Sequence, residues 1–180
     1  VYFNYRQLLS TGYRHDNCQF YMPGFWYRRN LRSPKKAPSF HTSDSWLLRE
    51  DRLSAPLTGI FSEKEKRFMT VNRLDDFSMD ALATHKEGEI ILSGKTSLGF
   101  TGFENQQGIA MLSFGFPYRE APKSYIRKLT LAPEVEAFQL MKKGESVLLT
   151  WEIMESGADD FSDFIQHTWE HCYDTYAPKP

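Results

Sequence analysis

Apolar and polar positions alternate through most of the chain, which is the pattern of β-strands that bury one face. Turn residues and short charged runs separate these segments at intervals typical of a sandwich or barrel, and no helical periodicity lies between them. The expected strands are residues 19–21, 25–29, 45–53, 57–61, 68–74, 89–93, 98–103, 108–116, 124–131, 135–140 and 146–154.

Three parts of this pattern predict more than a strand. The charged turn at residues 62–66 predicts a hairpin between the strands that flank it. The strands at 89–93, 98–103 and 108–116 are read as a meander, and the last of them is apolar on both faces, as a central strand is. The clearest alternation lies in residues 146–154, where one face would carry Val147, Leu149, Trp151 and Ile153.

The period changes after Gly157, where the apolar spacing becomes that of an amphipathic helix of about four turns. Asp159 or Asp160 is expected to cap its first turn, and Pro178 to end it. Its wide apolar stripe, read as a docking surface, holds Phe161, Phe164, Ile165, Trp169, Cys172, Tyr173 and Tyr176. The predicted fold is therefore an all-β, antiparallel β-sandwich over residues 1–157, followed by a C-terminal amphipathic α-helix and linker over residues 158–180.

Net charge and the length of apolar runs limit the classes of partner, and the cysteine content limits the possible disulfides. Lys and Arg total 22 against 23 Asp and Glu, so no overall positive field would attract nucleic acid. No apolar run reaches the length that spans a bilayer, so membrane insertion is not expected. Cys18 and Cys172 stand far apart, and the sequence leaves open whether they are two free thiols or one long-range disulfide.

The helix contains one motif with catalytic precedent. His167-Thr168-Trp169-Glu170-His171 spells the H-x-x-E-H pattern of inverted zinc peptidases. That chemistry needs a further ligand well downstream, and only nine residues follow His171, none of them Glu. The motif is therefore interpreted as a solvated helix face, and no metal, cofactor or catalytic residue is predicted.

Two charged and aromatic segments are candidate contact sites. Trp26, Tyr27 and Arg28 could stack on a sugar ring, although a strand Trp also suits a core. Trp46, Arg49, Asp51 and Arg52 could form a polar rim for a sugar or a neighbouring domain, although Arg beside carboxylates is commonly a structural ion pair.

The segments 23–30 and 46–56, together with the closing helix and its Trp169, His171 and Tyr173 before Ala177-Pro178, carry a resemblance. The chain resembles the N-terminal supersandwich domain that precedes an (α/α)-toroid catalytic domain in bacterial glycoside hydrolase-like proteins. The resemblance implies that the helix leads to a toroid outside these residues, that catalysis belongs to the toroid, and that the protein is periplasmic or at the cell surface.

Three functions follow as hypotheses. The first is a non-catalytic accessory domain that supports a neighbouring catalytic domain of the same chain, in a glycoside hydrolase or polysaccharide lyase. The second is a free-standing carbohydrate-binding module that binds oligosaccharide. The third is a small glycan-active enzyme.

Overall fold

The protein is a β-sandwich of two largely antiparallel sheets with one helix packed on its outside. The computed structural model describes residues 1–31, 38–75, 89–92, 96–126 and 130–177. Its strands are β1 (Tyr2–Phe3), β2 (Tyr5–Arg14), β3 (Cys18–Met22), β4 (Trp26–Arg28), β5 (Ser45–Arg49), β6 (Leu57–Ser62), β7 (Arg67–Arg73), β8 (Glu89–Leu92), β9 (Phe100–Gln106), β10 (Ile109–Phe116), β11 (Arg119–Ile126), β12 (Thr130–Leu140) and β13 (Trp151–Gly157). The helix is α1 (Phe161–Tyr176), and two short 3-10 turns are η1 (His15–Asn17) and η2 (Glu50–Arg52). This confirms the predicted fold class.

The two sheets differ in size and connectivity. The larger has the order β1-β12-β11-β5-β9-β10-β2, with β8 added on β12, and the smaller has the order β13-β7-β6-β3-β4. The predicted hairpin is confirmed, because β6 and β7 pair antiparallel from Ser62↔Arg67 onward. The predicted meander is wrong in its first strand: β8 pairs β12 in parallel, whereas β9 pairs β10 and β5.

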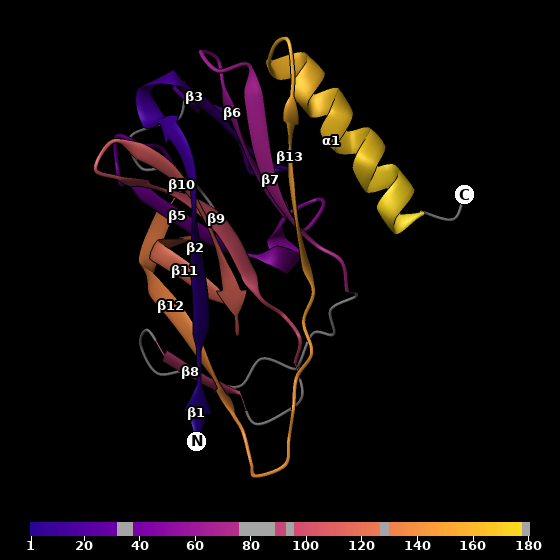
Figure 1. Cartoon of the computed structure of the whole chain (residues 1–180). Helices are drawn as coiled ribbons and strands as arrows, with labels where there is room; N and C mark the ends of the chain where they lie inside the picture. The colour runs from indigo at the N-terminus through magenta and orange to yellow at the C-terminus, as the bar shows by residue number, and fades with distance from the viewer. Residues whose placement is uncertain (32–37, 76–88, 93–95, 127–129, 178–180) are drawn as a thin grey trace.

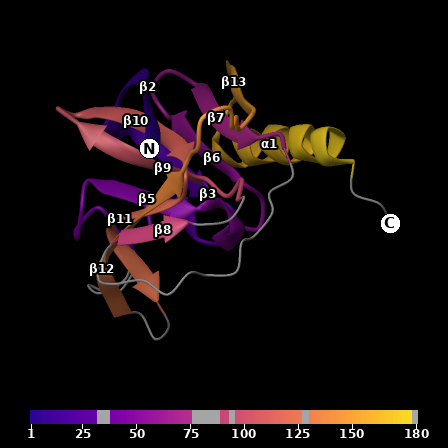
Figure 2. The same cartoon turned by 90° about the horizontal axis from the view of Figure 1, so that it is seen from below.

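Three layers result, and the strand period explains them. Along β3, Phe20 and Met22 point between the sheets, where they meet Trp46 and Phe103 of the large sheet. Tyr21, on the alternate face of β3, joins a second apolar cluster that contains Phe161 and Phe164 of α1. Figure 2 shows α1 on the side of β6 and β7 that faces away from β5 and β9.

The helix boundaries follow the predicted chemistry. Asp160 is the N-cap, because its side chain accepts hydrogen bonds from the backbone N–H groups of Ser162 and Asp163. The helix closes at Ala177, which adopts a left-handed conformation, and Pro178 lies outside the described residues. Among the residues that the structure describes, no helix has the length and apolar content needed to cross a membrane.

The last expected strand begins later than predicted. Only Trp151 and the residues after it pair, as β13, with β7 (Figure 1). Val147 and Leu148 are exposed, while Trp151 packs on Phe114 between the sheets with ring centroids 5.3 Å apart. The alternation of residues 146–150 therefore belongs to a surface segment.

Candidate functional site

Helix α1 is fixed to the small sheet by the buried phenylalanines of its apolar stripe, Phe161 and Phe164. The Phe164 ring stacks on Phe61 at 6.0 Å and contacts Phe68 at 5.0 Å. Gly59 of β6 makes this approach possible, because a Cβ there would lie 2.6 Å from Cζ of Phe164. At the other end of α1, the Tyr176 hydroxyl donates to the backbone carbonyl oxygen of Arg73 at 2.6 Å. Both ends of the helix are thus anchored.

The rest of the stripe stays at the surface. Trp169 is 41% exposed and Tyr173, one helical turn further on, is 66% exposed. The indole Nε1 of Trp169 donates to the hydroxyl of Tyr21 at 2.8 Å, which fixes the ring's orientation. Burial raises the pKa of that Tyr21 hydroxyl. A solvent-facing indole is therefore held by a residue of the sheet.

Strand β4 extends this surface. Tyr27 is 53% exposed, and its ring meets Tyr21 edge-on at 5.8 Å and Phe161 at 5.0 Å. The Arg28 guanidinium lies 5.2 Å from the centroid of the Phe161 ring, within cation–π range. We call the exposed side chains of Tyr27, Trp169 and Tyr173 the α1 aromatic face. The structure thus brings the candidates Tyr27 and Arg28 together with the candidate docking helix.

Trp26 and Trp46 are placed elsewhere. Both are buried between the sheets, and their rings lie 6.1 Å apart. The Trp26 indole donates to the carbonyl oxygen of Arg28, and that of Trp46 to the carbonyl oxygen of Ser39. Neither ring offers a stacking face to a ligand at the surface, so their role in this structure is in the core.

The charged candidates lie on the other side of the sandwich. Trp46 and Leu48 of β5 face the core, so Arg49 points outward from the large sheet, away from α1. Arg49 pairs with Asp51 through two hydrogen bonds, and its guanidinium lies 4.8 Å from the ring centroid of Tyr118. Arg52 pairs with Glu120. These contacts form a polar cluster that the fold separates from the α1 aromatic face.

The histidines of the H-x-x-E-H pattern bind different carboxylates. His171 pairs with Glu152 of β13, whereas Nε2 of His167 lies 3.4 Å from Oδ1 of Asp163 on the helix itself. Glu170 accepts a hydrogen bond from Gln166. Within the described ranges, no group of three His, Cys, Asp or Glu side chains is arranged to hold a metal ion.

The cysteines are free and buried in separate clusters. Cys18 belongs to the core between the sheets, and Cys172 to the layer under α1. Burial raises the pKa of the Cys18 thiol to about 12 and that of Cys172 to about 11. The free-thiol alternative is therefore confirmed, and neither sulfur is an activated nucleophile.

Sequence reasoning missed a buried polar network that joins four segments. Oε2 of Glu50 lies 3.1 Å from Arg73 and accepts the backbone N–H of Gly99 at 2.9 Å. Its Oε1 accepts the indole N–H of Trp151 at 3.1 Å. Glu50 lies inside the charged run that the sequence indicated, but no charge pattern distinguishes it from the surface residues beside it.

Comparisons of the chain with protein-family models, curated proteins and solved structures find no match.

Proposed function

We propose that this β-sandwich is a non-catalytic accessory domain of a larger carbohydrate-degrading protein, and that a neighbouring catalytic domain of the same chain packs on the α1 aromatic face. Export to the periplasm or cell surface is part of the same proposal. The observation that carries it is the division of the helix stripe: Phe161 and Phe164 are buried on the sheet, whereas Trp169 and Tyr173 are exposed.

Two physical arguments support this proposal: exposing aromatic side chains to water is unfavourable, and the side chains of this face are already held in place by neighbouring residues. Aromatic side chains dominate the energetics of protein interfaces, and rigid ones lose less entropy on binding. Trp169 is already oriented by Tyr21, and Tyr27 is braced by Phe161. The face therefore has the composition and the preorganisation of an interface core.

The full-length encoded polypeptide tests this proposal. A Trp169→Ala/Tyr173→Ala variant should speed limited proteolysis between the sandwich and its neighbour while leaving the sandwich itself resistant. Tyr5→Ala is the control, because Tyr5 is an aromatic residue on the other sheet whose exposure (42%) is close to that of Trp169 (41%). A polypeptide that ends near residue 180, or equal proteolysis of the variant and the wild type, would refute the accessory role.

The second candidate is an oligosaccharide-binding module, and the fixed indole of Trp169 favours it. An exposed, oriented indole suits stacking on a pyranose ring, and Arg28 lies at the edge of the same surface. Titrating the protein with hexasaccharides of glucose, xylose and N-acetylglucosamine, while following tryptophan fluorescence, tests it. Saturable change that is lost in Trp169→Ala supports the module; no change with any sugar supports the accessory role.

A further inference from the structure

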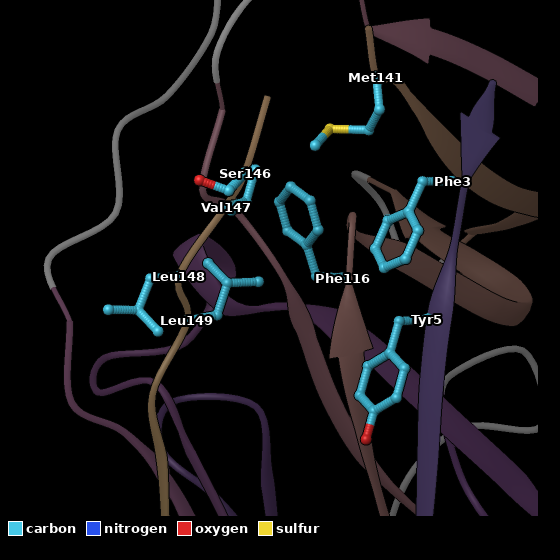
Figure 3. A pocket seen from close by; sticks show the side chains of 8 residues that line it. All are labelled: Phe3, Tyr5, Phe116, Met141, Ser146, Val147, Leu148 and Leu149. Carbon is cyan, nitrogen blue, oxygen red and sulfur yellow. The ribbon is translucent and has the colours of Figure 1, made fainter. Parts of the chain in front are cut away.

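A second surface feature lies at the end of the sandwich that carries the N-terminus, away from α1 (Figure 1). It is a pocket of about 360 Å³ between the start of β2, the end of β10 and the segment that precedes β13. Figure 3 shows the side chains that form it: Phe3, Tyr5, Phe116, Met141, Ser146, Val147, Leu148 and Leu149.

The pocket wall is mostly apolar. The rings of Phe3 and Phe116, with centroids 6.5 Å apart, form one side, and Val147 and Leu149 face them. Among the described residues that line the pocket, there is no Asp, Glu, Lys, Arg or His. The Tyr5 hydroxyl donates away from the pocket to Gln7, and Figure 3 shows the Ser146 oxygen turned away from the rings.

Hydrogen bonds anchor both ends of the segment that forms one wall of the pocket. The backbone nitrogen of Val1 donates to the carbonyl oxygen of Met141, and the Met141 N–H donates back to the carbonyl oxygen of Val1 at 2.9 Å. The turn that follows is closed by Glu145, whose carboxylate accepts the N–H of Lys142. Beyond the pocket, Asp75 accepts the N–H of Thr150. The segment that carries Val147 and Leu149 is therefore anchored at both of its ends.

Around the pocket lies a concentration of exposed apolar side chains. Four of the fourteen large hydrophobic residues that are exposed in the described chain line the pocket: Phe3, Tyr5, Val147 and Leu148. Exposed apolar side chains that gather at one place are typical of binding sites.

We propose that this pocket binds the alkyl chain of a small neutral amphiphile, with the chain against Phe3 and Val147 and the polar end in solvent. The volume falls in the range of small-molecule sites, about 300–1,000 Å³. A sugar would leave its hydroxyl groups without partners against this wall, which is costly. Met141 adds a deformable thioether, which suits a flexible chain better than a rigid ring. This site is independent of the accessory role proposed above.

Straight-chain alcohols test the proposal directly. Hexanol, octanol and decanol are titrated below their solubility limits while the methyl NMR signals of Met141 and Leu149 are followed. Each added methylene that enters the pocket should tighten binding about fourfold, since burying one contributes about 0.8 kcal/mol. The gain should stop once the chain fills the pocket. Affinity that is independent of chain length, or no saturable shift, would overturn the proposal.

Two matched variants locate the site. Val147→Asp places a carboxylate in the wall and should weaken decanol binding by about tenfold or more. Ile153→Asp is the control, because Ile153 is a β-branched residue of similar exposure (49% against 43%) that does not line the pocket. Equal loss in both variants would contradict the assignment. Binding to phosphatidylcholine vesicles without binding to free alcohols would also overturn it, because the ligand would then be a lipid surface.

Discussion

The carboxylate of Glu50 and the guanidinium of Arg73 form an ion pair inside the sandwich, and both side chains are 0% exposed. Glu50 lies in η2 and Arg73 ends β7, so the pair links the connection after β5 to the small sheet. Trp151 donates to the same carboxylate, and its ring lies 4.9 Å from the guanidinium carbon. The pair therefore positions the first residue of β13.

Removing one partner of this pair should be more damaging than removing both. Arg73→Met leaves a buried carboxylate without its counter-charge and should lower the free energy of unfolding by about 3–5 kcal/mol. Adding Glu50→Gln should restore part of that loss, giving a non-additive double-mutant cycle in urea unfolding. Arg67→Met is the control: its ion pair with Glu155 is exposed, so the change should stay within about 1 kcal/mol. Strict additivity would contradict a coupled pair.

Gly59 should be needed for docking of α1. In Gly59→Ala the new Cβ would lie 2.6 Å from Cζ of Phe164 and 3.1 Å from Cγ2 of Thr70, so the Phe164 ring or the helix that carries it must shift. We expect a loss of about 1–3 kcal/mol in urea unfolding. Gly157→Ala is the control, because its Cβ would meet only the Lys66 carbonyl oxygen at 3.6 Å. A smaller side chain in Gly59→Ala/Phe164→Leu should reduce the penalty; an unchanged penalty would point to a backbone cause.

The Asp160 cap should make helix docking sensitive to acid. Hydrogen bonds from the N–H groups of Asp163 and Ser162 lower the pKa of Asp160 below its usual value. A carboxyl group with a lowered pKa in the folded state adds stability above its unfolded pKa, and this is lost as the pH falls through the folded value. In urea titrations, Asp160→Ala should therefore be less stable than wild type at pH 7, and the gap should narrow below about pH 4. Asp160→Asn keeps a cap and should lose less at pH 7. A gap that is constant from pH 7 to pH 3 would exclude the carboxylate as its source.

Both cysteine thiols should be unreactive towards a disulfide reagent in the folded protein. With pKa values of about 12 and about 11, Cys18 and Cys172 are almost entirely protonated at pH 8 and are also buried. We expect negligible reaction with a disulfide reagent over minutes in buffer and two equivalents in urea. Val147→Cys supplies an exposed thiol as a positive control and should react at once. Rapid reaction of either native cysteine would show that its cluster opens.

The parts of the fold that were predictable are those in which a buried face requires apolar residues at regular spacing along the sequence. The β6–β7 hairpin, the central strand β10 and the capped helix α1 all bury one or both faces, so their sequences carry the pattern. Strand β2 was not predicted. It is an edge strand of the large sheet and pairs with β10. Of its ten residues only Thr11 and Tyr13 are buried, so its sequence shows little alternation of apolar and polar residues.

The candidate site was predictable only in part, for a related reason. Helical spacing placed Trp169 and Tyr173 on one stripe, but only the pairing of β3 with β4 brings Tyr27 beside them through Tyr21. Local sequence could not distinguish the buried Trp26 from the exposed Tyr27, because the register of β4 decides which neighbour faces the core. The Glu50–Arg73 pair depends on contacts between residues far apart in the chain.

The bond between the Tyr176 hydroxyl and the backbone of Arg73 has a mechanical consequence. The bond couples the last residue of α1 to the last residue of β7. That residue also holds the buried carboxylate of Glu50. The end of α1 is therefore connected through Arg73 to a charged pair in the interior, so a force acting on that end of the helix would reach the core of the sandwich directly.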